Sequence, residues 1–329
     1  MRCAAISRAL PLLRPPASRR TGALIDALLL SLGPNTTCVY PYDSTSGASQ
    51  HDFPQWGGAC FVNRITASKR LLVFLTITFA ISWSAWWVLV GLVPNQGLTF
   101  DNLPIVTLYM LGGFGPTIAA FAAVLATPTE GSFREFNSRL FRWRVNAGWY
   151  VVAFALPVIL EFASLKLVAT LEHGPEASFA LQPLWRLLPL FGTMIVGGGL
   201  EELGWRGVAQ PELEKQSSRL LATTLIGAIW ATWHIPLFFI HGVSQYHTGF
   251  PLFALRVLGL AFFLAWLYSG THSILLCVLF HAAVNTAAAM NPTHISGNLT
   301  AAFIAAVINL ALGVGLVVAS QRRPAGAGS

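Results

Sequence analysis

The hydrophobic positions of this chain gather in long apolar runs that succeed one another from Leu71 to the C-terminal region. Each run is close to the roughly 20 residues that a helix needs to cross a bilayer. Eight such segments can be delimited, at 71–93, 103–126, 149–171, 185–210, 219–240, 252–269, 272–289 and 299–320. The pattern therefore predicts an all-α fold, a polytopic integral membrane bundle of about eight transmembrane helices.

Basic residues are distributed unevenly among the loops between these segments. Lys or Arg occurs before the first segment, between the second and third, between the fourth and fifth, and after the last, whereas the loops 94–102, 172–184, 241–251 and 290–298 contain neither. By the positive-inside rule, we expect the basic loops and both termini to be cytoplasmic. The expected location is the plasma membrane of a bacterium. Only Gly270 and Thr271 separate the sixth and seventh segments, which predicts a tight cytoplasmic hairpin.

The first 68 residues differ from the rest of the chain. Five Arg and no acidic residue occur in the first 20 positions, and a short apolar stretch and a Gly/Ser/Pro-rich region follow. We interpret 1–68 as an irregular Arg-rich extension, either disordered or upstream of the true start codon. A targeting peptide is the alternative. The expected organisation is thus 1–68, a transmembrane domain at 69–323, and a short flexible tail at 324–329.

Composition agrees with a membrane protein and excludes other classes. Hydrophobic residues make up 54% of the chain and charged residues only 10%, whereas about 25% are charged in a soluble domain. The four cysteines form no metal-binding or redox motif. The net charge of +7 would suit nucleic acid, but the basic residues flank membrane segments. We therefore expect the lipid bilayer, and no nucleic acid, as a partner.

Few ionisable side chains lie within the apolar segments. Each costs about 3 kcal/mol at a helix centre in lipid, so those present usually mark functional sites. The candidates are Glu161, Lys166, Glu201, Glu202, Arg206, His234 and His281. Glu161 and Lys166 are five residues apart, off-register for a pair on one helix face, and we interpret them as structural.

Two adjacent carboxylates, Glu201 and Glu202, lie in the Gly-rich stretch 197–207. In a helix, Glu202 and Arg206 have i, i+4 spacing and can form an ion pair. Glu201 then points about 100° away and is free for other work. The Gly triplet 197–199 would let a neighbouring helix approach closely. Taken alone, this stretch equally fits the cytoplasmic end of a span, where acidic residues cost little.

Two histidines favour a functional interpretation. His234 follows Trp230 by one helical turn, and His281 precedes Asn285 by one turn. If the fourth segment is an unbroken helix, Glu201, His234 and Asn285 all lie about 20 to 22 Å from the cytoplasmic ends of their helices. Glu201 could then act as general base on a water that His234 helps to hold. His281 and Asn285 could donate hydrogen bonds to a tetrahedral oxyanion.

These residues resemble the motifs of the CPBP (Abi/CAAX-type) intramembrane proteases, which include the Ras-converting CAAX endopeptidases. The EExxxR motif stands at Glu201 to Arg206, the aromatic–His motif at Trp230 and His234, and HxxxN at His281 to Asn285. The order and spacing match, and the resemblance covers roughly 70–320. Trp instead of Phe at position 230 is a mild departure. The segment 1–68 has no counterpart in the family pattern.

The resemblance implies an intramembrane endopeptidase that cuts a membrane-associated protein or peptide, in CAAX proteases just after a prenylated cysteine. It implies that Glu201 activates water with help from His234, and that His281 and Asn285 form the oxyanion site. Glu202 and Arg206 would organise the site, with Trp230 supporting it.

Two questions stay open at the level of sequence. Family members have been called metalloproteases, and zinc is an alternative cofactor here, with Glu201, Glu202, His234 and His281 as ligands. No HExxH motif supports a metal independently, so we favour a metal-independent glutamate mechanism. The alternative function is a non-proteolytic membrane scaffold or bacteriocin-immunity-type protein that binds a peptide partner. A transporter fits the topology, but no pair of broken helices recurs in the two halves.

Overall fold

The computed structural model describes residues 36–38, 60–62, 68–93, 97–99, 101–128, 132–172, 182–290 and 299–322. The chain divides into two units, Met1–Ile65 with Gln216–Ser218, and Thr66–Lys215 with Arg219–Ser329. In the first unit, β1 (Thr36–Cys38) pairs antiparallel with β2 (Cys60–Val62). Most of the predicted extension and the whole predicted tail lie outside the described residues, so these domain limits stay predictions.

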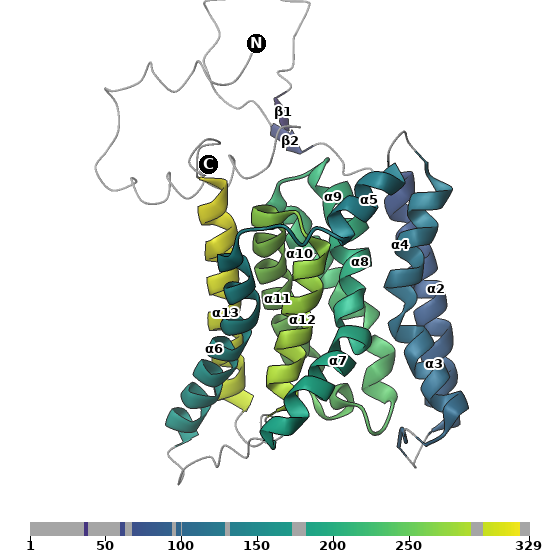
Figure 1. Ribbon diagram of the computed structural model, residues 1–329, viewed down its shortest axis with the longest axis vertical. Helices are drawn as coiled ribbons and strands as arrows, with labels where there is room; N and C mark the ends of the chain where they lie inside the picture. Colours follow the sequence, from purple (N-terminus) through teal and green to yellow (C-terminus); the bar gives the residue numbers. More distant parts are fainter. Residues whose placement is uncertain are drawn as a thin grey trace, which may run out of the picture. The chain divides into compact units, whose positions relative to one another are not determined.

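The second unit is a bundle of helices, and its all-α class is confirmed (Figure 1). Its α-helices are α2 (Lys69–Leu92), α3 (Leu103–Gly113), α4 (Gly115–Ala126), α5 (Ser132–Leu140), α6 (Ala147–Glu172), α7 (Leu187–Gly197), α8 (Glu202–Gly204), α9 (Gln210–Glu214), α10 (Arg219–Trp233), α11 (Phe250–Thr271), α12 (Ile274–Ala289) and α13 (Leu299–Gln321).

Among the residues that the structure describes, five continuous stretches are long and apolar enough to cross a membrane, namely Lys69–Leu92, Ala147–Leu171, Arg219–Phe239, Phe250–Thr271 and Leu299–Gln321. The pair α3 and α4, bent by 50°, would form a sixth span. Helix α12 is apolar but shorter. Membrane spans are therefore supported, and the number eight remains a prediction.

The predicted fourth segment, 185–210, is not one continuous α-helix. After α7 the chain forms a 3₁₀ turn at Gly199–Glu201, the short α8, a π-helix at Trp205–Ala209, and α9. The depth estimated for Glu201 assumed an unbroken helix and does not hold. π-Helical turns occur mostly at functional sites, because they shift the side chains that follow out of the regular helical register.

Close packing against α12 accompanies the break after α7. A Cβ atom added to Gly198 would lie 2.4 Å from Asn285 Nδ2, and one on Gly199 would lie 2.8 Å from the Val278 carbonyl oxygen. The predicted close approach is thus confirmed for these two glycines. Gly197 differs, because an added Cβ there would meet no atom within 4 Å.

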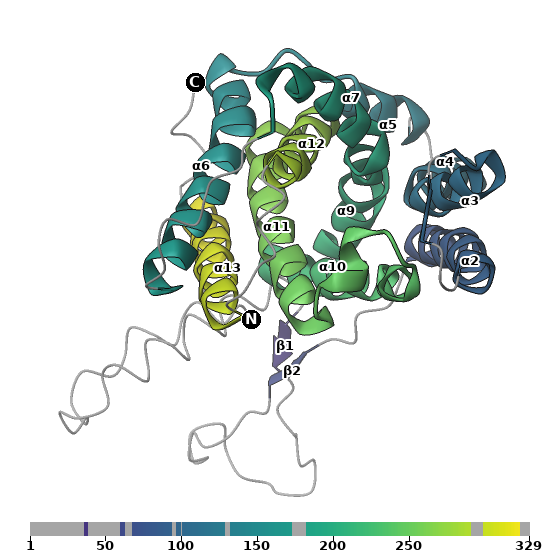
Figure 2. The ribbon, with the colours of Figure 1, turned by 90° about the horizontal axis from the view of Figure 1, so that it is seen from below.

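The bundle has a central group of helices flanked by two outer groups (Figure 2). Helices α10, α11 and α12 and the α8–α9 segment lie in the middle, with α2, α3 and α4 on one side and α6 and α13 on the other. The outer helices expose large apolar side chains such as Val151, Ile159 and Val307, at 66%, 60% and 52%. Exposed apolar area of this kind suits a surface that faces lipid.

Basic loops gather at one end of the bundle, where α5 and α9 lie (Figure 1). Glu212 in α9 pairs with Lys215 at 2.7 Å and with Arg70 of α2 at 3.6 Å, and Arg219 pairs with Glu214 at 3.2 Å. Burial raises the pKa of Glu212, but the hydrogen bond from Lys215 and the nearby cations outweigh it and leave that pKa below its ordinary value. An ion pair therefore joins the start of α2 to α9.

The predicted hairpin between the sixth and seventh segments is also tight. Helix α11 ends at Thr271, α12 begins at Ile274, and His272 between them adopts φ 49°, in the left-handed region. The Ser273 hydroxyl accepts a hydrogen bond from Leu276 N and caps α12. The connection is short because the two residues between the helices complete a C-cap and an N-cap.

Candidate functional site

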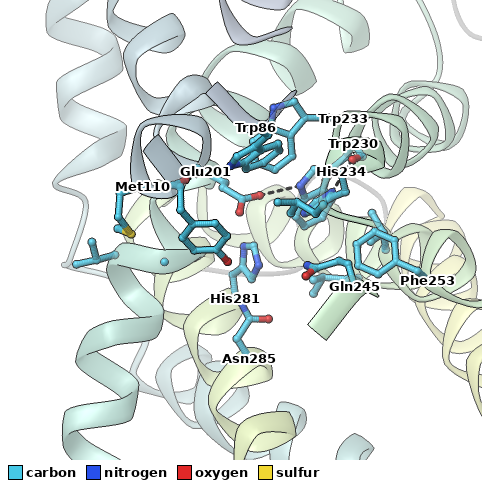
Figure 3. Close-up of a pocket in the computed structure, with 17 residues that line it drawn as sticks. Trp86, Met110, Glu201, Trp230, Trp233, His234, Gln245, Phe253, His281 and Asn285 are labelled. Atoms are coloured by element: carbon cyan, nitrogen blue, oxygen red, sulfur yellow. Dashed lines mark hydrogen bonds between the residues drawn. The ribbon is translucent and has the colours of Figure 1, made fainter. Parts of the chain in front are cut away.

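A cavity of about 140 Å³ lies among the central helices (Figure 3). It is lined by Glu201 from the 3₁₀ turn, His234 from the end of α10, and His281 and Asn285 from α12. All four residues predicted to be catalytic therefore face one space, although up to 84 positions separate them in sequence. Trp230, predicted to support the site, lines the same cavity.

The Glu201 side chain is buried, with only 7% exposed, and is held in a defined orientation. Its Oε2 accepts a hydrogen bond of 2.8 Å from Trp230 Nε1, drawn as a dashed line in Figure 3. The turn that carries it is fixed by Thr117 of α4, whose hydroxyl donates to the Leu200 carbonyl oxygen at 2.8 Å. Glu201 also lines the cavity, so its carboxylate can meet a water there.

Glu202 and Arg206 form the predicted i, i+4 ion pair, with 2.8 Å between Oε2 and a terminal guanidinium nitrogen. The two atoms lie outside hydrogen-bond geometry, so their attraction is mainly one of charge. Both side chains are completely buried, and Arg206 also donates to the Ala261 carbonyl oxygen at 3.2 Å. Glu202 turns its other oxygen, Oε1, to His281 Nδ1 at 2.9 Å. The Glu202–Arg206 ion pair thus holds the His281 ring through its Nδ1 atom.

The hydrogen-bond partners of the two imidazoles indicate which ring nitrogen carries the proton. His234 Nδ1 lies 2.8 Å from the Trp230 carbonyl oxygen, which can only accept, so Nδ1 carries hydrogen and donates. His281 Nδ1 donates in the same way to the Glu202 carboxylate. In their neutral forms both rings therefore keep a lone pair on Nε2.

Asn285 lies one turn beyond His281 on the same face of α12, as predicted (Figure 3). Both polar side chains reach the backbone at the end of α7. From an ideal Cβ at Gly198, Asn285 Nδ2 is 2.4 Å away and His281 Nε2 is 3.4 Å away. The missing side chain of Gly198 therefore leaves the room that these two groups occupy.

Several lining residues were not anticipated from the sequence. Tyr109 and Met110 come from α3, Phe253 comes from α11, and Gln245 comes from the 3₁₀ turn Ser244–His247. An aromatic or apolar residue in an apolar segment carries no signal that distinguishes a cavity wall from ordinary packing. Gln245 lies in a predicted loop, where a polar residue is unremarkable. Only the tertiary arrangement brings these residues to the site.

The alternative cofactor is zinc, and the positions of the four candidate ligands show whether they could bind it together. Within the described residues, no three His, Cys, Asp or Glu side chains are placed so that they could hold one metal ion. Glu202 is committed to Arg206 and to His281, and a cation paired at 2.8 Å opposes a second cation at the same carboxylate. The four candidate ligands therefore do not form a zinc site as they are arranged.

Glu161 and Lys166 of α6 do not line the cavity. Arg256 in α11 was overlooked, although a charged residue within an apolar segment is the signal that identified the other candidates. Its charge interacts with that of Glu161. Nearby on the same outer helices, Asn309 of α13 donates to the Ser164 hydroxyl of α6 at 3.1 Å. These contacts lie outside the cavity lining.

Comparison with known proteins agrees with the geometry of the site. Residues 183–287 match a family model described as type II CAAX prenyl endopeptidase Rce1-like. A similar protein, CAAX prenyl protease 2 from Methanococcus maripaludis, is 26% identical over 231 residues, which are 65% of this chain and 82% of that protein. Both matches support a relationship to the CPBP family. The matched region contains all seven predicted site residues, and the relationship supports intramembrane endopeptidase activity in general.

Proposed function

We propose that this protein hydrolyses a peptide bond of a membrane-associated protein or peptide with a water activated by Glu201. The observation that carries the proposal is the convergence of Glu201, His234, His281 and Asn285 on one buried cavity. A carboxylate, two imidazoles and a carboxamide are the groups that peptide hydrolysis needs for proton transfer and oxyanion stabilisation.

In the first step, Glu201 removes a proton from the attacking water. Trp230 holds Oε2 and so orients the Glu201 carboxylate, which lines the cavity where the water would lie. His234 Nε2 accepts the other hydrogen of this water, because its Nδ1 proton is committed to the Trp230 carbonyl. The water oxygen then bonds to the carbonyl carbon of the substrate. When the intermediate collapses, the C–N bond breaks and Glu201 passes its proton to the leaving amine.

Asn285 and His281 stabilise the oxyanion that forms between these steps. The Asn285 amide can donate at any pH, whereas neutral His281 has a bare Nε2 and must take up a proton before it donates there. The Glu202 carboxylate accepts the Nδ1 hydrogen and orients the ring, in the same way as the aspartate of a Ser–His–Asp triad. Glu202 is thus a positioning residue, and Arg206 fixes Glu202.

For the substrate, we propose a CAAX-type or other peptide presented at the membrane. Tyr109, Met110 and Phe253 give the cavity apolar walls beside the reacting groups. Such walls suit the hydrophobic surroundings of a lipid-modified or membrane-anchored cleavage site. The similar archaeal protein is named a CAAX prenyl protease. The charge pattern of the loops supports cytoplasmic termini, and we propose the plasma membrane of a bacterium as the location.

The decisive experiment compares Glu201→Gln with Glu161→Gln in purified protein. Both variants neutralise a glutamate within the membrane domain, but Glu161 does not line the cavity. With a farnesylated CAAX peptide and a non-prenylated membrane-tethered peptide as substrates, we expect Glu201→Gln to lower kcat by about 10²- to 10⁴-fold. Glu161→Gln should cleave at the wild-type rate.

Folded Glu201→Gln protein that cleaves either peptide normally would overturn the mechanism. Wild-type protein that binds both peptides but cuts neither would favour the scaffold alternative. The zinc alternative is tested in the same preparation by measuring bound metal and by adding a chelator. We propose that cleavage persists with the chelator present, and its loss together with stoichiometric zinc would establish the metalloprotease.

A further inference from the structure

The segment between α4 and α6 presents a surface that the proposed reaction does not use. It comprises α5 and the turn after it, and we call it the basic–aromatic surface. Its outward side chains are Phe133, Arg134, Phe141, Arg142, Trp143 and Arg144, all of them exposed. Phe133 is 45%, Phe141 70% and Trp143 59% exposed. Large apolar and cationic groups therefore alternate over a stretch of 12 positions.

The positive charge of this surface is not neutralised locally. Arg134, Arg142 and Arg144 form no ion pair with any residue that the structure describes. Its acidic residue, Glu135, lies 3.6 Å from Arg139. Arg144 instead lies over the Trp143 ring, 4.9 Å from its centroid. Three guanidinium groups are thus free to meet an external anion.

The pKa of His272, in the turn between α11 and α12, responds to the same positive charge. Burial lowers its pKa, and the charges of Arg142 and Arg219 lower that pKa further, against an opposing contribution from Glu214. An anion bound beside Arg142 would offset part of this positive charge.

The segment is held firmly by contacts that leave these side chains outside. Phe136 is completely buried, and its ring carbon would lie 2.7 Å from a Cβ at Gly207 in the π-helix. The Ser273 hydroxyl donates to the Arg142 carbonyl at 2.6 Å, and the Tyr150 hydroxyl donates to the Trp143 carbonyl at 2.7 Å. Because the backbone is already ordered, binding an anion here would cost little conformational entropy.

Position along the chain places this surface at the edge of the bilayer. It connects the end of one apolar segment, α4, with the start of the next, α6. Tryptophan is enriched at the level of the lipid headgroups. Amphipathic segments with basic residues on one face and aromatic residues on the other bind at that level, more strongly when the lipids are anionic.

We propose that the basic–aromatic surface binds the headgroups of anionic phospholipids, with Arg134, Arg142 and Arg144 facing the phosphates. Phe133, Phe141 and Trp143 lie among the glycerol groups and upper acyl chains. Each Arg near an anionic surface contributes about five-fold in affinity, so the three together account for about 100-fold.

The experiment titrates the full-length protein in detergent with phosphatidylglycerol or phosphatidylcholine and measures lipid binding by native mass spectrometry. We expect phosphatidylglycerol to bind more tightly, and the double variant Arg142→Gln/Arg144→Gln to lose about 25-fold of that affinity. Arg322→Gln is the matched control, because Arg322 is an exposed cation at the end of α13, outside this surface. It should keep wild-type affinity.

Further arms distinguish the source of the anion and the kind of partner. Inorganic phosphate in excess should not displace phosphatidylglycerol, because it lacks the acyl chains that contact the aromatic groups. Equal affinity for the two lipids, or no loss in the folded double variant, would overturn the proposal. So would a polyglutamate peptide that occupies the surface and resists displacement by phosphatidylglycerol.

Discussion

The space that Gly198 leaves for Asn285 and His281, the two residues proposed to bind the oxyanion, offers the sharpest test of the site. An alanine at this position adds one methyl group, which would start 2.4 Å from Asn285 Nδ2 and 3.4 Å from His281 Nε2. A carbon and a nitrogen atom in ordinary contact stand about 3.5 Å apart. Asn285 must therefore withdraw by about 1 Å, whereas His281 needs almost no movement.

The size of the effect follows from that displacement. A misplacement of about 1 Å costs up to 10²-fold in rate, and removing one oxyanion donor costs about 10²- to 10³-fold. We therefore expect Gly198→Ala to lower kcat by about 10²-fold, or about 2.7 kcal/mol. Gly192→Ala in α7 is the matched control, because its new methyl group would meet no atom within 4 Å and Gly192 does not line the cavity.

The assay is steady-state cleavage of a membrane-tethered peptide, with thermal unfolding measured on the same samples. A double-mutant cycle with Asn285→Ala adds a stricter condition. Once the amide is gone, the methyl group has nothing to displace, so Gly198→Ala/Asn285→Ala should be no slower than Asn285→Ala alone. Fully additive losses, or an equal loss in Gly192→Ala, would refute the reasoning.

Three further predictions concern Trp230, Arg206 and His272. Trp230→Phe keeps the ring but removes the hydrogen bond to Glu201, a charged acceptor, so kcat should fall about 10- to 100-fold; an unchanged kcat would contradict that role. Arg206→Met leaves Glu202 buried without its cation and should cost about 3 to 5 kcal/mol in the free energy of unfolding. In chemical unfolding, we expect the double variant Glu202→Gln/Arg206→Met to regain the lost free energy of unfolding. If it does not, Arg206 stabilises the protein through packing. The pKa of His272 is lowered by burial and neighbouring cations, so the unfolded chain binds this proton more readily and stability falls as the pH drops below 6.5. His272→Asn, which also tolerates φ 49°, should flatten the dependence of Tm on pH between about 8 and 5, and a parallel curve would exclude His272 as its source.

Much of the helical framework could be predicted because apolar runs are a local property of the chain. The segments 71–93, 149–171 and 299–320 correspond to α2, α6 and α13 within two residues at each end. The i, i+4 pair of Glu202 and Arg206 was equally local and is confirmed.

Other features escaped prediction because distant contacts decide them. Segment 185–210 looked like one helix, since its hydropathy does not record that Gly199 packs against the Val278 carbonyl. The hydrogen bond from Trp230 to Glu201 joins two separate segments of the chain. The hydrophobic periodicity of each segment does not determine how the two are rotated relative to each other. Gln245 became a cavity residue only through the fold of its loop.

The sequence by itself determined that this protein is a membrane bundle, and it singled out the few polar residues that line one cavity. It could do so because a charge inside an apolar segment is costly wherever the helices later pack. Only the tertiary structure decided that Glu201 faces Trp230, that Glu202 holds His281, and that Gly198 leaves room for Asn285. Those outcomes depend on helix rotation and on distances of a few ångströms, which packing among several helices fixes together.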